Sequence, residues 1–448
     1  ADARSRILKE LTSPAPAMPL DVHNYFVELI RNVTTVIAQG NYHPAARINA
    51  ILLLGGLNSR EAVLLGDAKS PPEPLIAALA FMLGEFENEQ QPDGVKAACL
   101  AGMLRHVKLD RLLPQANRRL VGNTAESRIV DAMVKLLQQD QTPEGRSPSG
   151  HVWMRRRAAE ILGWLGSTGG GEVTKELERI AADESQSVAL RCDAAEALGR
   201  LNYGQNGAPS PADLAKKLGA VAVFACHQEI ERVEEQQKME EEREAASSPY
   251  GGYGGEYGSD YGSDYEEGYG EDYGESYGED YGSSYGEDYG SSYGMMPGVE
   301  VKPFDPLGYR VHLTRRRIKS QLLSVREGLA GPQLKDGQVG GLLAATAEPA
   351  DQEYLNKVIA GIDAITTVID EASQEDMETL LESIGTAVQD MEDSCAIVVN
   401  LGEEPLDEDF LSNPMDSGDE LGVPLDGSEA APPLDAGPAG TPPVGPPI

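Results

Sequence analysis

Residues 191–201 read RCDAAEALGRL, and residues 155–166 read RRRAAEILGWLG. In both stretches apolar residues recur at helical spacing, two alanines stand in the middle, and a glycine follows near the end. Helices whose axes approach to about 8–10 Å need small residues at the crossing and larger apolar residues on either side. The repeated pattern therefore predicts helices that stack against one another.

The same spacing begins at two earlier positions, Arg47 and Lys96. In each copy a basic residue is followed, three and four places on, by two small or apolar residues. In the copy at Arg47 the sequence then continues to Leu54-Gly55. The copy at Lys96 is the weaker one, because its glycine, Gly102, comes two places early. The residues of this repeat signature are Arg47, Ala50 and Gly55 in one copy, Arg155, Ala158, Ala159 and Gly163 in another, and Arg191, Ala194, Ala195 and Gly199 in a third.

Each of these stretches follows another segment with apolar residues at helical spacing. One helix pair cannot bury both of its faces, so several pairs must stack. Residues 20–230 are therefore predicted to form about four antiparallel helix pairs, followed by a fifth helix from Pro211 that caps the end of the stack. The first helices of the pairs are expected at 21–38, 74–87, 124–139 and 171–183.

The pattern R-x-x-A-A-E-A-L-G resembles the second helix of HEAT-like repeats, especially those of the short bacterial type. The resemblance covers residues 20–205 and is carried most clearly by 155–166 and 191–201. It implies an α-solenoid whose surface binds other macromolecules. It implies no chemistry by itself, because a fold does not determine a function.

The net charge of −36 is distributed unevenly along the chain. Residues 1–230 carry 25 basic and 26 acidic side chains, whereas residues 401–448 carry 11 acidic and no basic ones. Proteins that bind nucleic acids usually cluster Lys and Arg against the phosphates. The charge pattern therefore predicts no nucleic-acid partner, and it favours solvated acidic segments outside the repeats.

A tyrosine falls on every fourth residue from Tyr253 to Tyr293, and glycine follows almost every one of them. Glycine opposes a helix by about 1 kcal/mol relative to alanine, so a helical tyrosine stripe is not favoured. Residues 245–300 are predicted to be a disordered Tyr-Gly-acidic linker. Residues 231–244 are expected to extend the fifth helix as a charged rod.

Three helical faces follow between residues 301 and 400 and predict a helical hairpin or small bundle. With the linker as a flexible spacer, this second module is expected about 40 Å from the stack on average. Residues 401–448 are predicted to form a disordered tail rich in acidic residues, Pro and Gly, and residues 1–19 a short lead-in. The apolar positions of the three faces are Ile318, Leu322, Val325 and Leu329; Leu355, Val358, Ile359, Ile362, Ile365 and Ile369; and Met377, Leu380, Leu381, Ile384, Val388 and Met391.

The sequence contains none of the common catalytic motifs that we sought. There is no H-E-x-x-H, phosphate-binding loop or G-x-S-x-G, and the cysteines at 99, 192, 226 and 395 do not form a C-x-x-C pair. The His-Glu pairs of metal-dependent HEAT-like hydroxylases are also missing. We therefore predict no catalytic residue, no cofactor and no metal site.

Two arginine triplets open predicted helices and are the candidate interaction residues. They are Arg155, Arg156 and Arg157, and Arg315, Arg316 and Arg317. One interpretation is local ion pairing within the helices. The other is that they bind the chain's own acidic tyrosine tract, since a guanidinium group gains about 0.5–1 kcal/mol over an exposed aromatic ring.

These patterns favour a non-enzymatic protein–protein interaction scaffold, whose partner is unidentified. In this hypothesis the solenoid surface binds the partner and the flexible acidic spacer tethers the second helical module. An alternative is a structural or surface-associated protein that self-associates weakly through the Tyr-Gly tract. A third hypothesis is a chromophore lyase or chaperone, as among HEAT-like bacterial proteins.

The compartment is not determined by the sequence. Unpaired cysteines favour the cytoplasm, whereas a leader removed before Ala1 would mean export. No apolar run approaches the ~18 residues that a membrane-spanning helix requires, so no membrane span is predicted.

Overall fold

The computed structural model shows an all-α protein, which confirms the predicted fold class. It describes residues 2–12, 19–65, 68–120, 124–204, 207–247, 306–331, 341–371 and 376–399. Residues 248–300 of the predicted linker and residues 401–448 of the predicted tail lie outside this range. Within it, strands occur only in two short antiparallel pairs between Asn58 and Pro74.

The described part of the chain contains fourteen α-helices, and short connections join most of those in its first half. They are α1 (Asp2–Thr12), α2 (Leu20–Gln39), α3 (Pro44–Gly55), α4 (Ile76–Glu87), α5 (Asp93–Leu112), α6 (Thr124–Leu137), α7 (Pro148–Leu165), α8 (Glu172–Ala182), α9 (Val188–Arg200), α10 (Pro211–Ser247), α11 (Pro306–Ala330), α12 (Gly341–Ala344), α13 (Pro349–Glu371) and α14 (Met377–Cys395). Two single 3₁₀ turns, η1 (Gln115–Asn117) and η2 (Gly169–Gly171), lie in connections. The connection between α3 and α4 holds β1 (Asn58–Arg60), β2 (Val63–Leu65), β3 (Ala68–Ser70) and β4 (Glu73–Pro74), where β1 pairs with β4 and β2 with β3.

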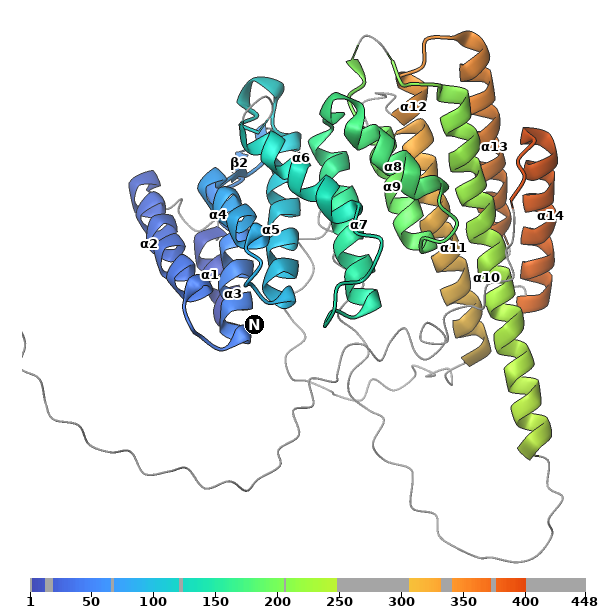
Figure 1. Ribbon diagram of the computed structural model, residues 1–448, viewed down its shortest axis with the longest axis horizontal. Helices are drawn as coiled ribbons and strands as arrows, with labels where there is room; N and C mark the ends of the chain where they lie inside the picture. The colour runs from blue at the N-terminus through green and yellow to red at the C-terminus, as the bar shows by residue number, and fades with distance from the viewer. Residues whose placement is uncertain are drawn as a thin grey trace, which may run out of the picture. The chain divides into compact units, whose positions relative to one another are not determined.

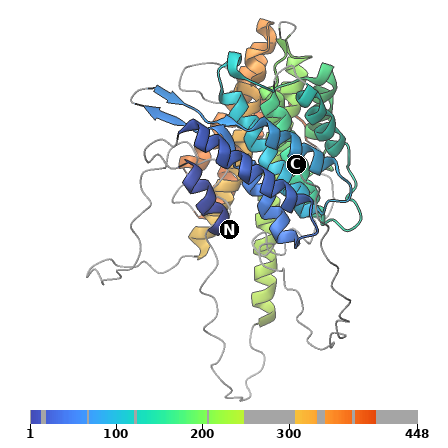
Figure 2. The ribbon, with the colours of Figure 1, turned by 90° about the vertical axis from the view of Figure 1, so that its left-hand side faces the viewer.

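The helices of the first half stack as antiparallel pairs (Figure 1). Helix α2 packs on α3, α4 on α5, α6 on α7, and α8 on α9. The second helices of the pairs contact one another in chain order, from α3 through α5 and α7 to α9. Figure 2 views this row from the end at which α2 lies. The four predicted pairs are therefore present.

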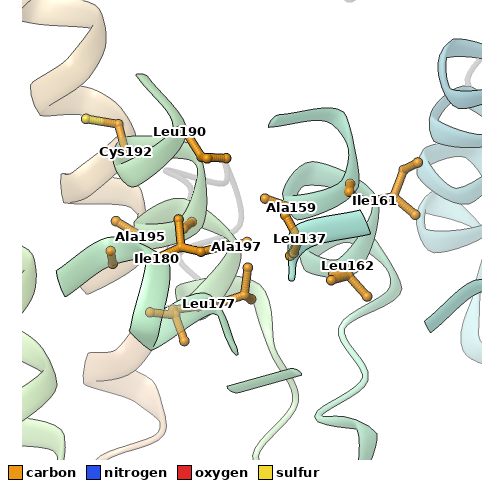
Figure 3. Close-up of a cluster of buried hydrophobic side chains, with 14 of the residues drawn as sticks. Leu137, Ala159, Ile161, Leu162, Leu177, Ile180, Leu190, Cys192, Ala195 and Ala197 are labelled. Carbon is orange, nitrogen blue, oxygen red and sulfur yellow. The ribbon is translucent and has the colours of Figure 1, made fainter. Parts of the chain in front are cut away.

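The interior of the stack is formed by apolar side chains from successive pairs (Figure 3). Leu162 of α7 lies near Leu137 of α6, and both are fully buried. Leu177 and Ile180 of α8, also fully buried, lie on the side of α9. Ala195 and Ala197 of α9 belong to the same cluster. Alternating leucine or isoleucine with alanine in this way gives dense packing at close helix spacing.

The predicted role of α10 as a cap was wrong. Apolar side chains on several sides of this helix are buried between Leu214 and Cys226, and a helix that is apolar all round lies inside a fold rather than on its surface. Helix α10 packs on α8 and α9 on one side and on α11, α13 and α14 on others. It is therefore the first helix of a fifth pair, whose second helix is α11.

The prediction of a separate module on a flexible spacer was also wrong. Helix α11 packs directly on α9, and the described helices from α1 to α14 belong to one compact unit. Two ion pairs join α10 to α11: Arg310 binds Glu240 through both carboxylate oxygens, at 2.5 and 2.7 Å, and Arg317 lies 3.1 Å from Glu229. Residues 248–305 therefore connect the adjacent ends of two antiparallel helices and do not set a distance between modules.

The three helical faces predicted between 301 and 400 lie on α11, α13 and α14. Their apolar residues are buried, apart from Met377, which is half-buried at the start of α14. The Tyr354 hydroxyl of α13 donates to the carbonyl of Cys395 at 2.9 Å, joining α13 to the end of α14. No helix in the described part of the chain combines the length and the apolar character needed to cross a bilayer.

Candidate interaction surface

The signature arginines fasten each second helix to the end of the first helix of its pair. The last carbonyl groups of an α-helix have no partner within the helix, and a cation near them is favourable. Each arginine fills this role for the helix before it, in three different pairs. The bonds are Arg47 Nε to Ala38 O (3.0 Å), Arg155 Nη2 to Leu137 O (2.8 Å) and Arg191 Nε to Ala181 O (3.1 Å).

Two of these arginines also reach the next pair of the stack. Arg47 donates to the amide oxygen of Gln91, in the turn before α5. Arg155 donates to Gln186, in the turn before α9, at 2.6 Å. The signature arginine therefore joins neighbouring pairs as well as the two helices of its own pair, which explains why the residue recurs.

The small residues of the signature stand where second helices cross. A Cβ atom built on Gly55 would lie 2.8 Å from the Cα atom of Gly102, and one built on Gly163 would lie 2.8 Å from the Cα atom of Ala197. The weak copy at Lys96 thus contributes its early glycine to the contact between α3 and α5. Ala50, Ala158, Ala159, Ala194 and Ala195 are likewise buried.

The first arginine triplet is used within the fold. Arg155 is 2 % exposed and also binds Asp140 at 2.7 Å. Arg156 binds Asp193 of α9 at 2.7 Å, and Arg157 binds Glu160 at 2.6 Å while its guanidinium group lies 5.2 Å from the centre of the Trp153 ring. Only Arg157 pairs within its own helix, whereas Arg155 and Arg156 pair with neighbouring segments of the fold.

The second triplet divides between fold contacts and solvent. Arg315 donates to the carbonyl of Ile369 at 2.8 Å, near the end of α13, as the signature arginines do elsewhere. Arg317 joins α11 to Glu229 of α10. Arg316 is exposed and has no hydrogen-bonding or ion-pair partner among the described residues.

A cluster of charges lies where α9 meets α11. Arg200 of α9 pairs with Glu196 and, at 3.2 Å, with Glu327 of α11, and its guanidinium group lies 4.4 Å from the centre of the Trp164 ring. Burial raises the pKa of Glu196 to about 7, with Arg200 opposing the rise and Glu327 adding to it. The contact between α9 and α11 therefore contains a carboxyl group that titrates near neutrality.

We expect this carboxyl group to make stability depend on pH. Because the pKa of Glu196 is about 7 in the folded chain and 4.5 ordinarily, the folded state binds the proton more tightly, and stability falls as pH rises between these values. The Glu196→Gln variant should lack this part of the fall, at most about 3 kcal/mol. Urea denaturation of both proteins at closely spaced pH values measures it. An identical fall in wild type and variant would contradict the assignment.

The four cysteines are all buried and unpaired. Burial raises the pKa of Cys99 and Cys192 strongly and that of Cys226 to about 12, which disfavours the reactive thiolate. Within the ranges that the structure describes, no three His, Cys, Asp or Glu side chains are grouped so that they could hold a metal ion.

The surface hollows are lined by residues that also support the fold. One lies between α5, α6 and α7, where Asp110 accepts the backbone N–H of Arg119 at 2.8 Å. Burial, and then the charge of Arg118, lower the pKa of Arg111 in the same hollow. Another lies beside Lys216, Tyr354 and Cys395. We assign no ligand and no chemical reaction to either hollow.

The largest exposed apolar feature among the described residues is on α2, at the first end of the row. We call it the outer stripe of α2. Residues at this spacing fall within about 100° of one another around a helix and form one face. The stripe consists of Val22, Tyr25, Phe26, Leu29, Val33 and Val36, which are between 38 % and 67 % exposed.

The opposite side of α2 faces the fold. His23, Val27, Thr34 and Ala38 are buried there, and α2 packs on α3. The Tyr25 and Phe26 rings of the outer stripe pack edge to face, with centroids 6.0 Å apart and planes at 72°. The outer stripe is thus a second apolar face, which is left exposed beside the described part of the fold.

Sequence reasoning placed α2 correctly but missed this face. A signal was available, because two apolar series run along the helix, one through Val22 and Leu29 and one through Val27 and Ile30. A helix that needs only one buried face usually carries one such series.

No protein-family description matches this chain, and neither the curated proteins nor the solved structures contain a match.

Proposed function

We propose that this protein is a non-enzymatic interaction scaffold that binds another protein through the outer stripe of α2. The observation that carries the proposal is the exposed apolar face of six residues at the end of the helix stack. Contiguous apolar patches of this kind mark protein-binding sites on soluble folds. The resemblance of the signature to HEAT-like repeats supports the same conclusion.

The stripe offers enough apolar surface to drive binding. Fully burying a valine, leucine or phenylalanine side chain is worth about 1.5–3 kcal/mol. The stripe side chains are about half exposed on average, so covering all six would contribute several kcal/mol. The Tyr25–Phe26 pair adds two aromatic anchors, the residue class that often dominates binding energy.

The rest of the stack supports α2 as a rigid platform. Arg47 binds the last turn of α2 and reaches across to Gln91 in the next pair. A binding helix that is held in this way loses little further freedom when a partner binds, which favours affinity. We assign the stacked pairs this supporting role.

A pull-down from cell lysate with residues 1–448 as bait tests the proposal. The bait is compared with a Leu29→Glu, Val33→Glu double variant, which places two charges in the stripe, and with a Val398→Glu control. Val398 is 81 % exposed and lies after α14, away from the stripe in sequence and in helix contacts. We expect wild type and control to retain the same specific protein and the double variant to lose it. Equal retention by all three baits would contradict the proposal.

A further inference from the structure

We propose that the partner of the outer stripe is the same stripe on a second copy of this chain, so that the protein forms a two-fold homodimer. This inference rests on the proposed function and specifies its partner. The distribution of exposed apolar side chains, the charge of the stripe and its area all support a contact between two copies.

The described surface offers no other apolar patch of comparable size. Beyond α2 and its neighbours, the exposed large apolar side chains lie on four other segments, with no more than two on any one of them. A head-to-tail contact needs a second, complementary patch elsewhere, whereas a two-fold contact uses one patch twice. The stripe therefore favours a closed dimer over a filament. These exposed side chains beyond α2 and its neighbours are Leu112, Met239, Tyr309, Leu323 and Val398.

The last helix pair also favours a two-fold contact over an end-to-end array. Helices α13 and α14 form the last pair and contribute no exposed large apolar side chain within their described lengths. An end-to-end array, in which the last pair of one copy covered α2 of the next, would leave α2 facing polar groups. Among the residues that the structure describes, a second α2 provides the matching apolar surface.

The stripe is also a neutral area on a strongly acidic chain. Copies with a net charge of −36 repel one another at long range, so a self-contact must avoid concentrating like charges. The six stripe residues carry no charge. Glu28, the acidic residue beside Leu29 in the sequence, is paired with Arg31, whose Nε donates to it at 3.0 Å. The other acidic residue of α2, Asp21, lies in its first turn, at one end of the stripe. Two stripes can therefore meet along most of their length without bringing unpaired carboxylates together.

The area of the stripe predicts a dimer of modest stability. Tyr25 is 67 % exposed and Val36 is 63 % exposed. Taking about 150–250 Å² for a whole aromatic side chain and less for valine or leucine, the six residues present roughly 500 Å² per copy. Two copies would bury about 1,000 Å², which is near the minimum for a specific interface. We therefore expect a dimer that dissociates on dilution.

Sedimentation velocity of the full-length protein from about 1 to 100 µM tests the inference. We expect wild type to pass from a 47.9 kDa monomer to a dimer within this range. The Leu29→Glu, Val33→Glu variant should remain monomeric, with dimerisation weakened more than about 100-fold, because each copy would bring two carboxylates into an apolar contact. The Val398→Glu control should dimerise like wild type. Circular dichroism confirms that each variant is folded.

Two outcomes would overturn the homodimer. One is a wild-type chain that stays monomeric over the whole range. In that case the proposed function still stands if the double variant loses a different protein that wild type retains. The other is a dimer that persists in the double variant, which would place self-association on another surface, such as the Tyr-Gly tract.

Discussion

Replacing Gly328 with alanine is expected to lower the free energy of unfolding by about 3 kcal/mol, because the new methyl group would force two helix backbones apart. A Cβ atom built on Gly328 would lie 2.2 Å from the carbonyl oxygen of Ala195 in α9. One built on Gly199 would lie 2.0 Å from the carbonyl oxygen of Gly328. These obstacles are backbone atoms, which cannot rotate away as a flexible side chain would. The variant should therefore lose the packing of α11 on α9.

Gly385 provides a matched control for this substitution. It lies within α14, and nothing stands within 4 Å of a Cβ atom built on it. Alanine in a helix is favoured over glycine by about 0.5–1 kcal/mol, so Gly385→Ala should stabilise the protein slightly. Urea denaturation followed by circular dichroism should thus give changes of opposite sign for the two variants. A Gly328→Ala protein as stable as wild type would show that α9 and α11 do not approach so closely.

The first four helix pairs could be predicted because their determinants lie within single helices. Arg155 and Arg191 stand at the same distance before Gly163 and Gly199, and the alanines between them repeat in register. Each of these residues acts on a helix adjacent in the stack, so the periodicity of one segment reports its own packing. The contact of Gly163 with Ala197 is an example.

The fifth pair could not be predicted in the same way. Residues 248–305 separate α10 from α11 in the sequence and are rich in tyrosine, glycine and acidic residues. Such a composition predicts a linker whether the two helix ends are adjacent or far apart. The entropy cost of closing a loop grows only slowly with its length, so a long insertion between adjacent helix ends is tolerated. The ion pair of Arg310 with Glu240, which joins those ends, has no signature in the local sequence.

The candidate site shows a related limit. The outer stripe of α2 has a clear helical period, but an apolar face covered by a neighbouring helix has the same period. Whether Leu29 or Val33 is exposed depends on the position of α2 at the end of the row, which is a property of the stack. For the arginine triplets the sequence left two interpretations, and it did not predict that Arg156 would pair with Asp193 and Arg317 with Glu229 of other helices.

Replacing Arg155 with methionine is expected to lower the free energy of unfolding by about 3–4 kcal/mol, because the buried guanidinium group satisfies partners from three segments. Its Nη2 donates to Leu137 O at 2.8 Å and to Asp140 at 2.7 Å, and its Nη1 donates to Gln186 at 2.6 Å. Methionine would fill part of the volume but offers no donor. Asp140 keeps its contact with Arg179, so the main loss falls on the Leu137 carbonyl and on Gln186.

Arg316→Met is the matched control, since Arg316 is exposed and has no polar partner among the described residues. Its stability should stay within about 0.5 kcal/mol of wild type. Arg156→Met should fall between the two, at about 1 kcal/mol, because Arg156 makes a single, partly exposed ion pair with Asp193. We expect the denaturation midpoints to fall in the order Arg316→Met, Arg156→Met, Arg155→Met. This order would support the role of Arg155 in joining neighbouring segments of the stack. An Arg155→Met protein as stable as the control would contradict this role. The recurrence of the signature arginine in several pairs would then need a reason other than the contacts that join α6, α7 and the turn before α9.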